Sequence, residues 1–220
     1  MLNEKSLHAS LRAWYARPRD RFEVPIDGYV VDIVRADLLV EIQTGHFAGI
    51  KSKLAALVRT HRVRLIYPIA EEKWIARMPR HGGGAATRRK SPRKGRIEDL
   101  FTETVHIPRL LSHRNFSLEV LMIREEEARR HDASRAWRRR GWVVEERRLL
   151  GVVDRRVFAS PQSWLALLPL STEPFTARDL AAAGGIGLAL AQKMAYTLRK
   201  AGLVRAMGKR GRAILYRVDR

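Results

Sequence analysis

The stretch that decides the fold is residues 29–45, Tyr-Val-Val-Asp-Ile-Val-Arg-Ala-Asp-Leu-Leu-Val-Glu-Ile-Gln-Thr-Gly. Two runs rich in β-branched residues flank a short polar break, a pattern that predicts a β-hairpin. With Ala36-Asp37 as the turn, Asp32 lies directly opposite Glu41, and the two side chains share one face of the sheet. A four-residue loop gives the same register, whereas a three-residue loop puts the two acids on opposite faces.

Two like charges that face each other across a sheet destabilise it unless positive charge lies between them. Val30, Val34 and Leu39 share the face of the two acids, so we expect this face to be covered. A divalent metal ion is the obvious compensating charge, because such ions prefer oxygen ligands. The alternative is a pair of acids on the solvent face of the hairpin.

The chain has 220 residues, a hydrophobic fraction of 45% and no cysteine. This composition supports a real core, in one large domain or two modest ones. Without cysteine there is neither a disulfide framework nor a thiolate metal site, and we expect a reducing compartment and a cytoplasmic protein. No apolar run approaches the roughly 20 residues that span a bilayer, so we expect no membrane partner.

The formal net charge is +20 and the pI about 11.3, which favours a polyanionic partner, most simply nucleic acid. This charge is unevenly placed. Residues 1–78 carry 13 basic and 9 acidic side chains, whereas residues 176–220 carry 10 and 2. The distribution predicts chemistry in the first part of the chain and polyanion binding at its end.

Hydrophobic periodicity predicts an α/β fold for the first part of the chain, with a mixed central sheet flanked by helices. The expected elements are a helix at 2–17, strands at 21–25, 29–34, 38–43, 62–68 and 73–78, and a helix at 47–60. On one face the first helix carries Glu4, Leu7, His8, Leu11, Trp14 and Tyr15.

Residues 79–159 are expected to complete this first domain, which covers 1–159. A glycine-rich basic loop at 79–96 is expected to be flexible, and it either clamps a phosphate backbone or is merely solvated. The following elements are expected to be a helix at 97–105, a strand at 117–124, a solvated helix or loop with surface ion pairs at 125–140, and β-structure at 141–158.

Residues 160–220 predict a second, smaller α+β domain. Helices are expected at 161–168, 177–183 and 188–201, capped where possible by Ser160 and Thr176, and strands at 203–207 and 213–218. This order resembles a winged helix-turn-helix domain, which implies DNA binding, with protein interaction as the alternative. The residues expected to contact DNA are Gln192, Lys193, Tyr196, Arg199, Lys200, Lys209, Arg210 and Arg212, with Arg88, Arg89 and Lys90 of the basic loop.

The acids of the first part form a recognisable series. Glu4 on the first helix, Asp32 on one strand and Glu41-Ile42-Gln43 on the next resemble the PD-(D/E)XK, or restriction-endonuclease-like, nuclease superfamily over residues 1–78. The resemblance implies that the three acids bind Mg²⁺ or Mn²⁺ and that the domain hydrolyses phosphodiester bonds. Gln43 stands where that family has a catalytic lysine.

A magnesium site suits these residue types, because Mg²⁺ takes oxygen ligands, lowers the pKa of a bound water and neutralises charge on a phosphate. Gln43 can hydrogen-bond the attacking water but carries no charge. Either Gln43 suffices, or Lys51 or Lys53 from the next helix supplies the charge, or the domain is inactive. His8, one helical turn from Glu4, can reach the same site, although a lone histidine is more often structural.

The sequence therefore predicts a metal-dependent DNA endonuclease that is targeted by a C-terminal winged helix. One alternative is a non-catalytic DNA-binding regulator with a degenerate nuclease fold, and another is an RNA-processing or RNA-binding protein. A helix of the major-groove type favours DNA over RNA. Cutting both strands usually takes two active sites, which would suit a homodimer. Because a P-loop is absent from the sequence, we expect no nucleotide cofactor.

Overall fold

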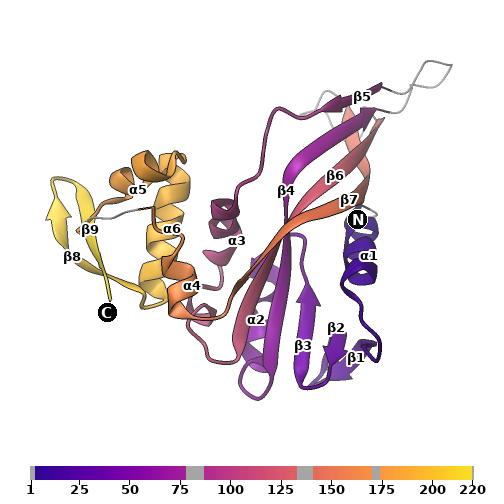
Figure 1. The fold of residues 1–220 in the computed structure, drawn as a ribbon, viewed down its shortest axis with the longest axis horizontal. Helices are drawn as coiled ribbons and strands as arrows, with labels where there is room; N and C mark the ends of the chain where they lie inside the picture. Colours follow the sequence, from indigo (N-terminus) through magenta and orange to yellow (C-terminus); the bar gives the residue numbers. More distant parts are fainter. Residues whose placement is uncertain (1–2, 78–86, 133–140, 170–173, 220) are drawn as a thin grey trace.

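The fold is built on one large mixed sheet (Figure 1). The computed structural model describes residues 3–77, 87–132, 141–169 and 174–219, and side chains from residue 7 onward. The sheet has the strand order β1-β2-β3-β4-β6-β7, with β5 paired to β4, and its β3–β4 and β4–β6 pairs are parallel. Its strands are β1 (Arg21–Ile26), β2 (Tyr29–Arg35), β3 (Leu38–Ile42), β4 (Arg62–Arg77), β5 (Thr87–Lys90), β6 (Phe116–His131) and β7 (Trp142–Phe158).

Helices cover both faces of this sheet, as the sequence predicts. The first-domain helices are α1 (Asn3–Tyr15), α2 (Phe47–Leu57), η1 (Ile97–Leu100), α3 (Phe101–Thr104) and η2 (Pro108–Leu110). On one face, Leu7 and Leu11 of α1 are fully buried against the sheet. On the other face, Leu54 and Leu57 of α2 belong to a second and larger core. Trp14, which the periodicity places on the buried stripe of α1, is 46% exposed.

The β2–β3 hairpin has the register that the sequence predicts. Ile33 pairs with Val40, and the chain turns at Ala36, whose φ of 49° lies in the left-handed region. The neighbours Ile33 and Val34 on β2, and Leu39 and Val40 on β3, belong to the cores on opposite faces of the sheet, as expected from the alternation of side chains along a strand. The expected cover is incomplete, because Val30 is 58% exposed.

The structure has one long strand, β4, where the sequence predicts two. The predicted strands 62–68 and 73–78 form a single strand of 16 residues, and the predicted break is only a register shift between Ala70 and Glu72. In the sequence, Pro68 and the two acids Glu71 and Glu72 favour a turn between two strands. Parallel pairing with β6 along nearly the whole length holds the strand extended across this irregularity.

Two further predictions about the middle region were wrong. The segment predicted as a solvated helix or loop at 125–140 continues β6 as far as His131, while residues 133–140 lie outside the described residues. Of the basic loop predicted as flexible, residues 87–90 form β5 on the edge of β4, and residues 78–86 are not described. The β-structure predicted at 141–158 is the single strand β7, with a register shift beside Gly151.

The C-terminal part follows the predicted order of a helix, a tight turn, a helix and a hairpin. Its elements are α4 (Pro161–Leu165), α5 (Ala177–Gly184), α6 (Leu188–Lys200), β8 (Val204–Arg210) and β9 (Ala213–Val218). Thr176 caps α5 by accepting a hydrogen bond from the Asp179 amide, and Ser160 caps α4 in the same way. Gly185 ends α5 with a φ of 57°, a conformation that glycine adopts without strain.

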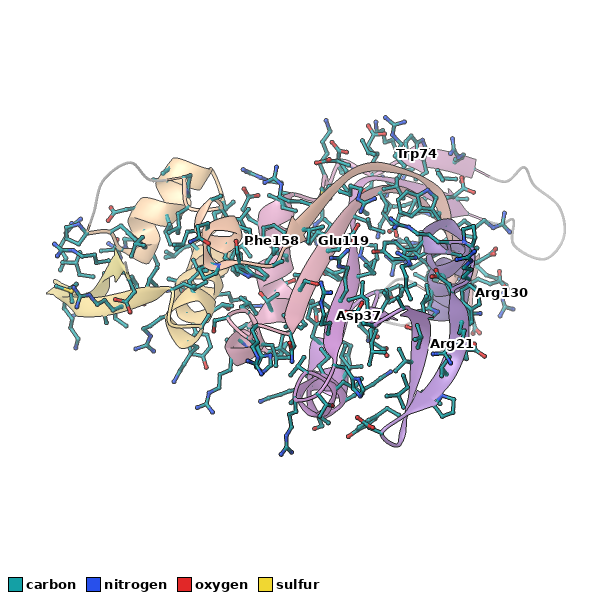
Figure 2. The ribbon with its side chains drawn as sticks, turned by 60° about the horizontal axis from the view of Figure 1, so that its bottom comes forward. Arg21, Asp37, Trp74, Glu119, Arg130 and Phe158 are labelled. Atoms are coloured by element: carbon teal, nitrogen blue, oxygen red, sulfur yellow. The ribbon has the colours of Figure 1, made fainter. Side chains whose placement is uncertain are left out.

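The C-terminal helices share a core with the sheet. One hydrophobic cluster joins the α2 face to α5 and α6, and α6 packs against α3. Phe158 stacks on Trp164 with ring centroids 4.7 Å apart, and Figure 2 shows Phe158 beside these helices. Arg96 donates hydrogen bonds to the carbonyls of Gly184 (2.8 Å) and Gly185 (2.9 Å), which lie at the end of α5. The two parts of the chain therefore pack through both apolar and polar contacts.

Candidate functional site

The candidate site lies where β2 begins and β3 ends, and its first half is centred on Asp32. The Asp32 Oδ2 atom accepts a hydrogen bond from the Ile42 amide at 2.8 Å and lies 3.2 Å from Nε2 of His8. His8 comes from α1, which covers one face of the sheet. Asp32 therefore ties the end of β3 to the first helix.

The second half consists of Glu41 on β3 and Lys53 on α2. Nζ of Lys53 lies 2.6 Å from Oε1 of Glu41, and the same ammonium donates to the Val30 carbonyl at 2.6 Å. The Glu41 side chain is only 7% exposed. Lys51, the other lysine that the sequence nominates, is exposed on α2. The structure thus brings Lys53 to the acid pair and leaves Lys51 on the surface.

The two acids have opposite pKa shifts. Burial raises the pKa of Glu41 to about 7, where the charge of Asp32 adds to the effect and Lys53 opposes it. Burial acts in the same direction on Asp32, but hydrogen bonds from His8 and from the Ile42 amide outweigh it and hold the pKa below its ordinary value. The hydrogen bond with Asp32 raises the pKa of His8. Near neutral pH, Asp32 is therefore ionised, whereas Glu41 is present in both its protonated and its ionised form.

The start of α2, the helix that carries Lys53, is held by a residue from α3. His46 precedes the helix in a left-handed conformation and its side chain makes no cap. Instead, Glu103 of α3 accepts a hydrogen bond from the Phe47 amide at 2.9 Å. A carboxylate at a helix N-terminus satisfies an amide that has no partner within the helix and suits the helix dipole. Glu103 has no local sequence signal, because it lies 56 residues from its partner.

The Gln43 side chain forms a hydrogen bond with the backbone of the turn that follows β3. Its side-chain Nε2 donates to the Gly45 carbonyl at 2.6 Å, and its amide donates to the Ile66 carbonyl at 2.9 Å. The side chain thus stabilises the turn from β3 into α2. Gln43 follows Glu41 with the same strand parity, as predicted, while the side chain of Ile42 packs in the core beneath α1.

The metal site predicted from the sequence includes Glu4 as a third ligand. The Glu4 backbone belongs to the first turn of α1, but its side chain lies outside the described residues. Among the described residues, no three Asp, Glu or His side chains are grouped so that they could hold a metal ion. Asp32 and Glu41 alone offer two carboxylates of the type that Mg²⁺ prefers, and one of them has a pKa raised by burial. These donors fit a hard divalent cation that keeps part of its water shell.

Comparison with known proteins places the chain in a family. Residues 5–159 match a domain of unknown function, DUF8091. The chain belongs to this family. It is also 31% identical over 219 residues to an uncharacterized protein of Treponema pallidum (strain Nichols), with 98% of this chain and 86% of that protein covered. No solved structure matches the chain.

The four side chains that meet at the hairpin all lie inside the DUF8091 match, whereas Glu4 lies one residue before it. The residues concerned are His8, Asp32, Glu41 and Lys53. The C-terminal helix pair and hairpin lie beyond the match. In the described part of the chain, no helix combines the length and apolar character needed to cross a membrane.

The nominated DNA-contact residues outside the DUF8091 match lie on α6 and on the β8–β9 hairpin. Gln192, Lys193, Tyr196 and Lys200 are exposed, whereas Arg199 is half-buried. At the hairpin, Lys209 and Arg212 are exposed, and Arg210 is paired with Asp179 at 3.2 Å. Exposed polar and basic side chains therefore lie along α6, and the hairpin tip lies near Gln192 in the first half of this helix.

Two of the basic residues at 88–90 take part in ion pairs with neighbouring strands, and the contact of all three with DNA stays a prediction. Arg88 and Lys90 pair with Glu126 and Glu72, and both cations lie 5.1 Å from the centroid of the Trp74 ring. Figure 2 shows Trp74 at the end of the sheet away from Phe158. These cations stabilise the β4–β5 edge, although their exposed side chains leave them within reach of solvent.

Proposed function

We propose that this protein is a metal-dependent DNA endonuclease whose active site is the acid pair of the β2–β3 hairpin. The observation that carries the proposal is the convergence of Asp32, Glu41 and Lys53 at one end of a buried hairpin. Lys53 supplies, from α2, the positive charge that Gln43 lacks. Two carboxylates and an ammonium in one place match the donors needed to bind a divalent ion and a phosphate.

Each side chain has a separate task in this proposal. Asp32 and Glu41 would hold Mg²⁺ or Mn²⁺, with Glu4 as a third ligand by resemblance to the PD-(D/E)XK nucleases. A bound ion supplies an activated water and neutralises developing charge on the phosphate. Lys53 stabilises negative charge on the phosphate oxygens, and His8 orients Asp32 through their 3.2 Å contact. Gln43 shapes the turn that leads to α2.

The C-terminal part supports a DNA substrate. We assign residues 1–159 to the catalytic domain and residues 160–220 to a winged-helix domain. The basic residues of the latter greatly outnumber its acids, and neutralising phosphates is the dominant source of affinity for DNA. Exposed Lys193 and Lys200 on α6 and Lys209 and Arg212 on the hairpin provide such contacts.

Cleavage by the purified full chain tests the proposal. Duplex, single-stranded and branched DNA, with RNA for comparison, are incubated with Mg²⁺, Mn²⁺ or EDTA. The wild type is expected to cut DNA only with a divalent ion. Glu41→Ala is expected to abolish cutting while DNA binding remains, because α6 and the hairpin are untouched.

Asp37→Ala is the matched control. Asp37 is an acid at the tip of the same hairpin, 70% exposed and paired with Arg62. Its removal is expected to leave cleavage unchanged. Cutting that persists in Glu41→Ala, or that is equally fast in EDTA, would exclude this active site.

The second candidate is a non-catalytic DNA-binding regulator, and one observation favours it. Nζ of Lys53 lies 2.6 Å from Oε1 of Glu41, so part of the negative charge of the acid pair is compensated without a metal. Tight, salt-sensitive DNA binding without cleavage of any substrate would support this candidate, since phosphate contacts weaken steeply with salt.

A further inference from the structure

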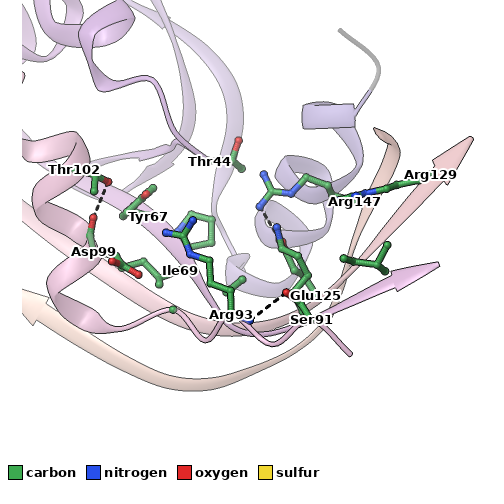
Figure 3. A pocket seen from close by; sticks show the side chains of 15 residues that line it. Thr44, Tyr67, Ile69, Ser91, Arg93, Asp99, Thr102, Glu125, Arg129 and Arg147 are labelled. Carbon is green, nitrogen blue, oxygen red and sulfur yellow. Dashed lines mark hydrogen bonds and ion pairs between the residues drawn. The ribbon is translucent and has the colours of Figure 1, made fainter. Parts of the chain in front are cut away.

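A cavity of about 390 Å³ lies on the sheet face that carries α2, and neither Asp32 nor Glu41 lines it (Figure 3). β4 contributes most of its lining, and the loop after β5, η1, the start of α3, the second half of β6 and the first half of β7 contribute further residues. Tyr67, Ile69 and Ile75 give it an apolar side. Lys73, Arg93, Arg129 and Arg147 bring four cations to its lining, against two carboxylates, Asp99 and Glu125.

The strand register places this cavity next to the acid pair. Glu41 pairs with Leu65 in the parallel β3–β4 ladder, so the two side chains lie on one face. Tyr67 follows Leu65 on that face, one two-residue step or about 7 Å along the strand. Thr44, just beyond β3, also lines the cavity. The cavity therefore begins one step beyond Glu41, along the direction in which β4 runs.

One wall is a short loop that is fastened to β4 at both ends. The Ser91 amide donates to the Lys73 carbonyl at 2.7 Å, and the Gly95 amide donates to the Ala70 carbonyl at 2.9 Å. A Cβ at Gly95 would lie 2.4 Å from the same carbonyl oxygen, so only glycine allows this close approach. The loop is thus a fixed part of the cavity, and it carries Arg93 between its two anchors.

The cations of the cavity are held in different ways. Glu125, which is fully buried, lies 2.8 Å from Nζ of Lys73 and 2.6 Å from Arg147. Arg129 is held by Glu127 at 2.6 Å. Arg93 has no carboxylate partner among the described residues, and Figure 3 shows its side chain turned into the cavity. Buried acids therefore orient the deeper cations, while Arg93 has donors available for a ligand.

We propose that this cavity binds a phosphate group that is attached to an organic residue, such as that of a nucleotide. Arginine donors suit phosphate oxygens because the planar guanidinium can bind two of them at once. The apolar side formed by Tyr67 and Ile69 suits the sugar or base that carries the phosphate. The phosphate comes either from a free nucleotide or from a nucleic-acid strand. Its assignment to a strand next to the cleaved bond rests on the proposed function.

Binding in EDTA tests this inference without cleavage, so its failure is distinguishable from failure of the nuclease proposal. The probes are deoxyadenosine monophosphate, deoxyadenosine, inorganic phosphate and a short single-stranded oligonucleotide with hydroxyls at both ends. Calorimetry with the full chain is expected to detect the monophosphate and not the nucleoside. Arg93→Gln is expected to weaken the binding of phosphate-bearing probes about tenfold, as expected for the loss of one charge-assisted hydrogen bond.

Lys94→Gln is the matched control, because Lys94 is the neighbouring exposed cation and does not line the cavity. A loss confined to Arg93→Gln and seen with the mononucleotide identifies a free nucleotide as a ligand. The same loss seen only with the oligonucleotide identifies a strand phosphate. Equal weakening by Arg93→Gln and Lys94→Gln, or binding of neither the monophosphate nor the oligonucleotide above that of the nucleoside, would overturn the inference.

Discussion

Two groups of buried acids in this sheet are compensated differently. On β6, Glu125 lies between Lys73 and Arg147, and Glu127 lies between Lys73 and Arg129. At the hairpin, Asp32 and Glu41 share one lysine, Lys53, and one histidine, His8. The β6 acids have more permanent positive charge around them than the hairpin acids have.

This difference separates acids that hold the fold from acids that are available for chemistry. A buried carboxylate is costly unless a cation and hydrogen bonds surround it. The β6 acids meet that condition with side chains from neighbouring strands. The hairpin pair meets it only in part, which is why burial raises the pKa of Glu41 to about 7. A site short of positive charge favours binding of a cation.

The largest effect expected from this comparison concerns Lys53. Lys53→Met is expected to slow single-turnover DNA cleavage about 10²–10³-fold, the range found when one donor to a transition-state anion is removed. Lys51→Met is expected to leave the rate nearly unchanged, since Lys51 is exposed and away from the acids. An equal loss in both variants would show that the helix, and not the Lys53 ammonium, is what matters.

The next effect distinguishes the two groups of acids by stability. Glu125→Gln is expected to lower the free energy of unfolding by roughly 3 kcal/mol, because it leaves Lys73 and Arg147 without their shared partner. Glu41→Gln is expected to change it by less than about 1 kcal/mol at pH 7, where Glu41 is already partly protonated. Urea unfolding at pH 7 measures both, and similar losses would remove the distinction.

A third effect is the pH dependence that Glu41 confers. Its folded pKa of about 7 lies above the ordinary 4.5, so the folded state binds the proton more tightly than the unfolded state. Its contribution to stability is therefore fully present below about pH 4.5 and is lost as pH rises through 7, in total on the order of 1–3 kcal/mol. Unfolding by urea between pH 5 and pH 8 should show a shallower slope for Glu41→Gln than for the wild type.

The smallest effect expected is that of His8. Asp32 raises the pKa of His8, so the contact contributes stability below the ordinary 6.5 and loses it as pH rises through the higher folded value. His8→Gln is expected to cost about 0.5–1 kcal/mol in acidic buffer and less at pH 8. His61→Gln, which removes a more exposed contact to Asp27, should cost less at either pH. The reverse order would place His8 outside the site.

Local sequence signals predicted those features in which neighbours along the chain decide the structure. The Ala36 turn set the hairpin register, and the caps at Ser160 and Thr176 marked the starts of two helices. The prediction failed for 125–131, whose charged residues resemble a solvated segment. Their cations come from β4 and β7, which lie far away in the sequence, so the acids could be buried in a strand.

The sequence by itself favoured the register in which Asp32 faces Glu41, because a two-residue and a four-residue loop both give it, and the structure has this register. Only the tertiary structure decided which lysine completes the pair. Lys51 and Lys53 are equivalent as sequence signals, and their roles separate once α2 packs on the sheet, where Lys53 reaches Glu41 and Lys51 stays exposed. Packing between distant segments, which no local pattern records, determines where the charge is placed.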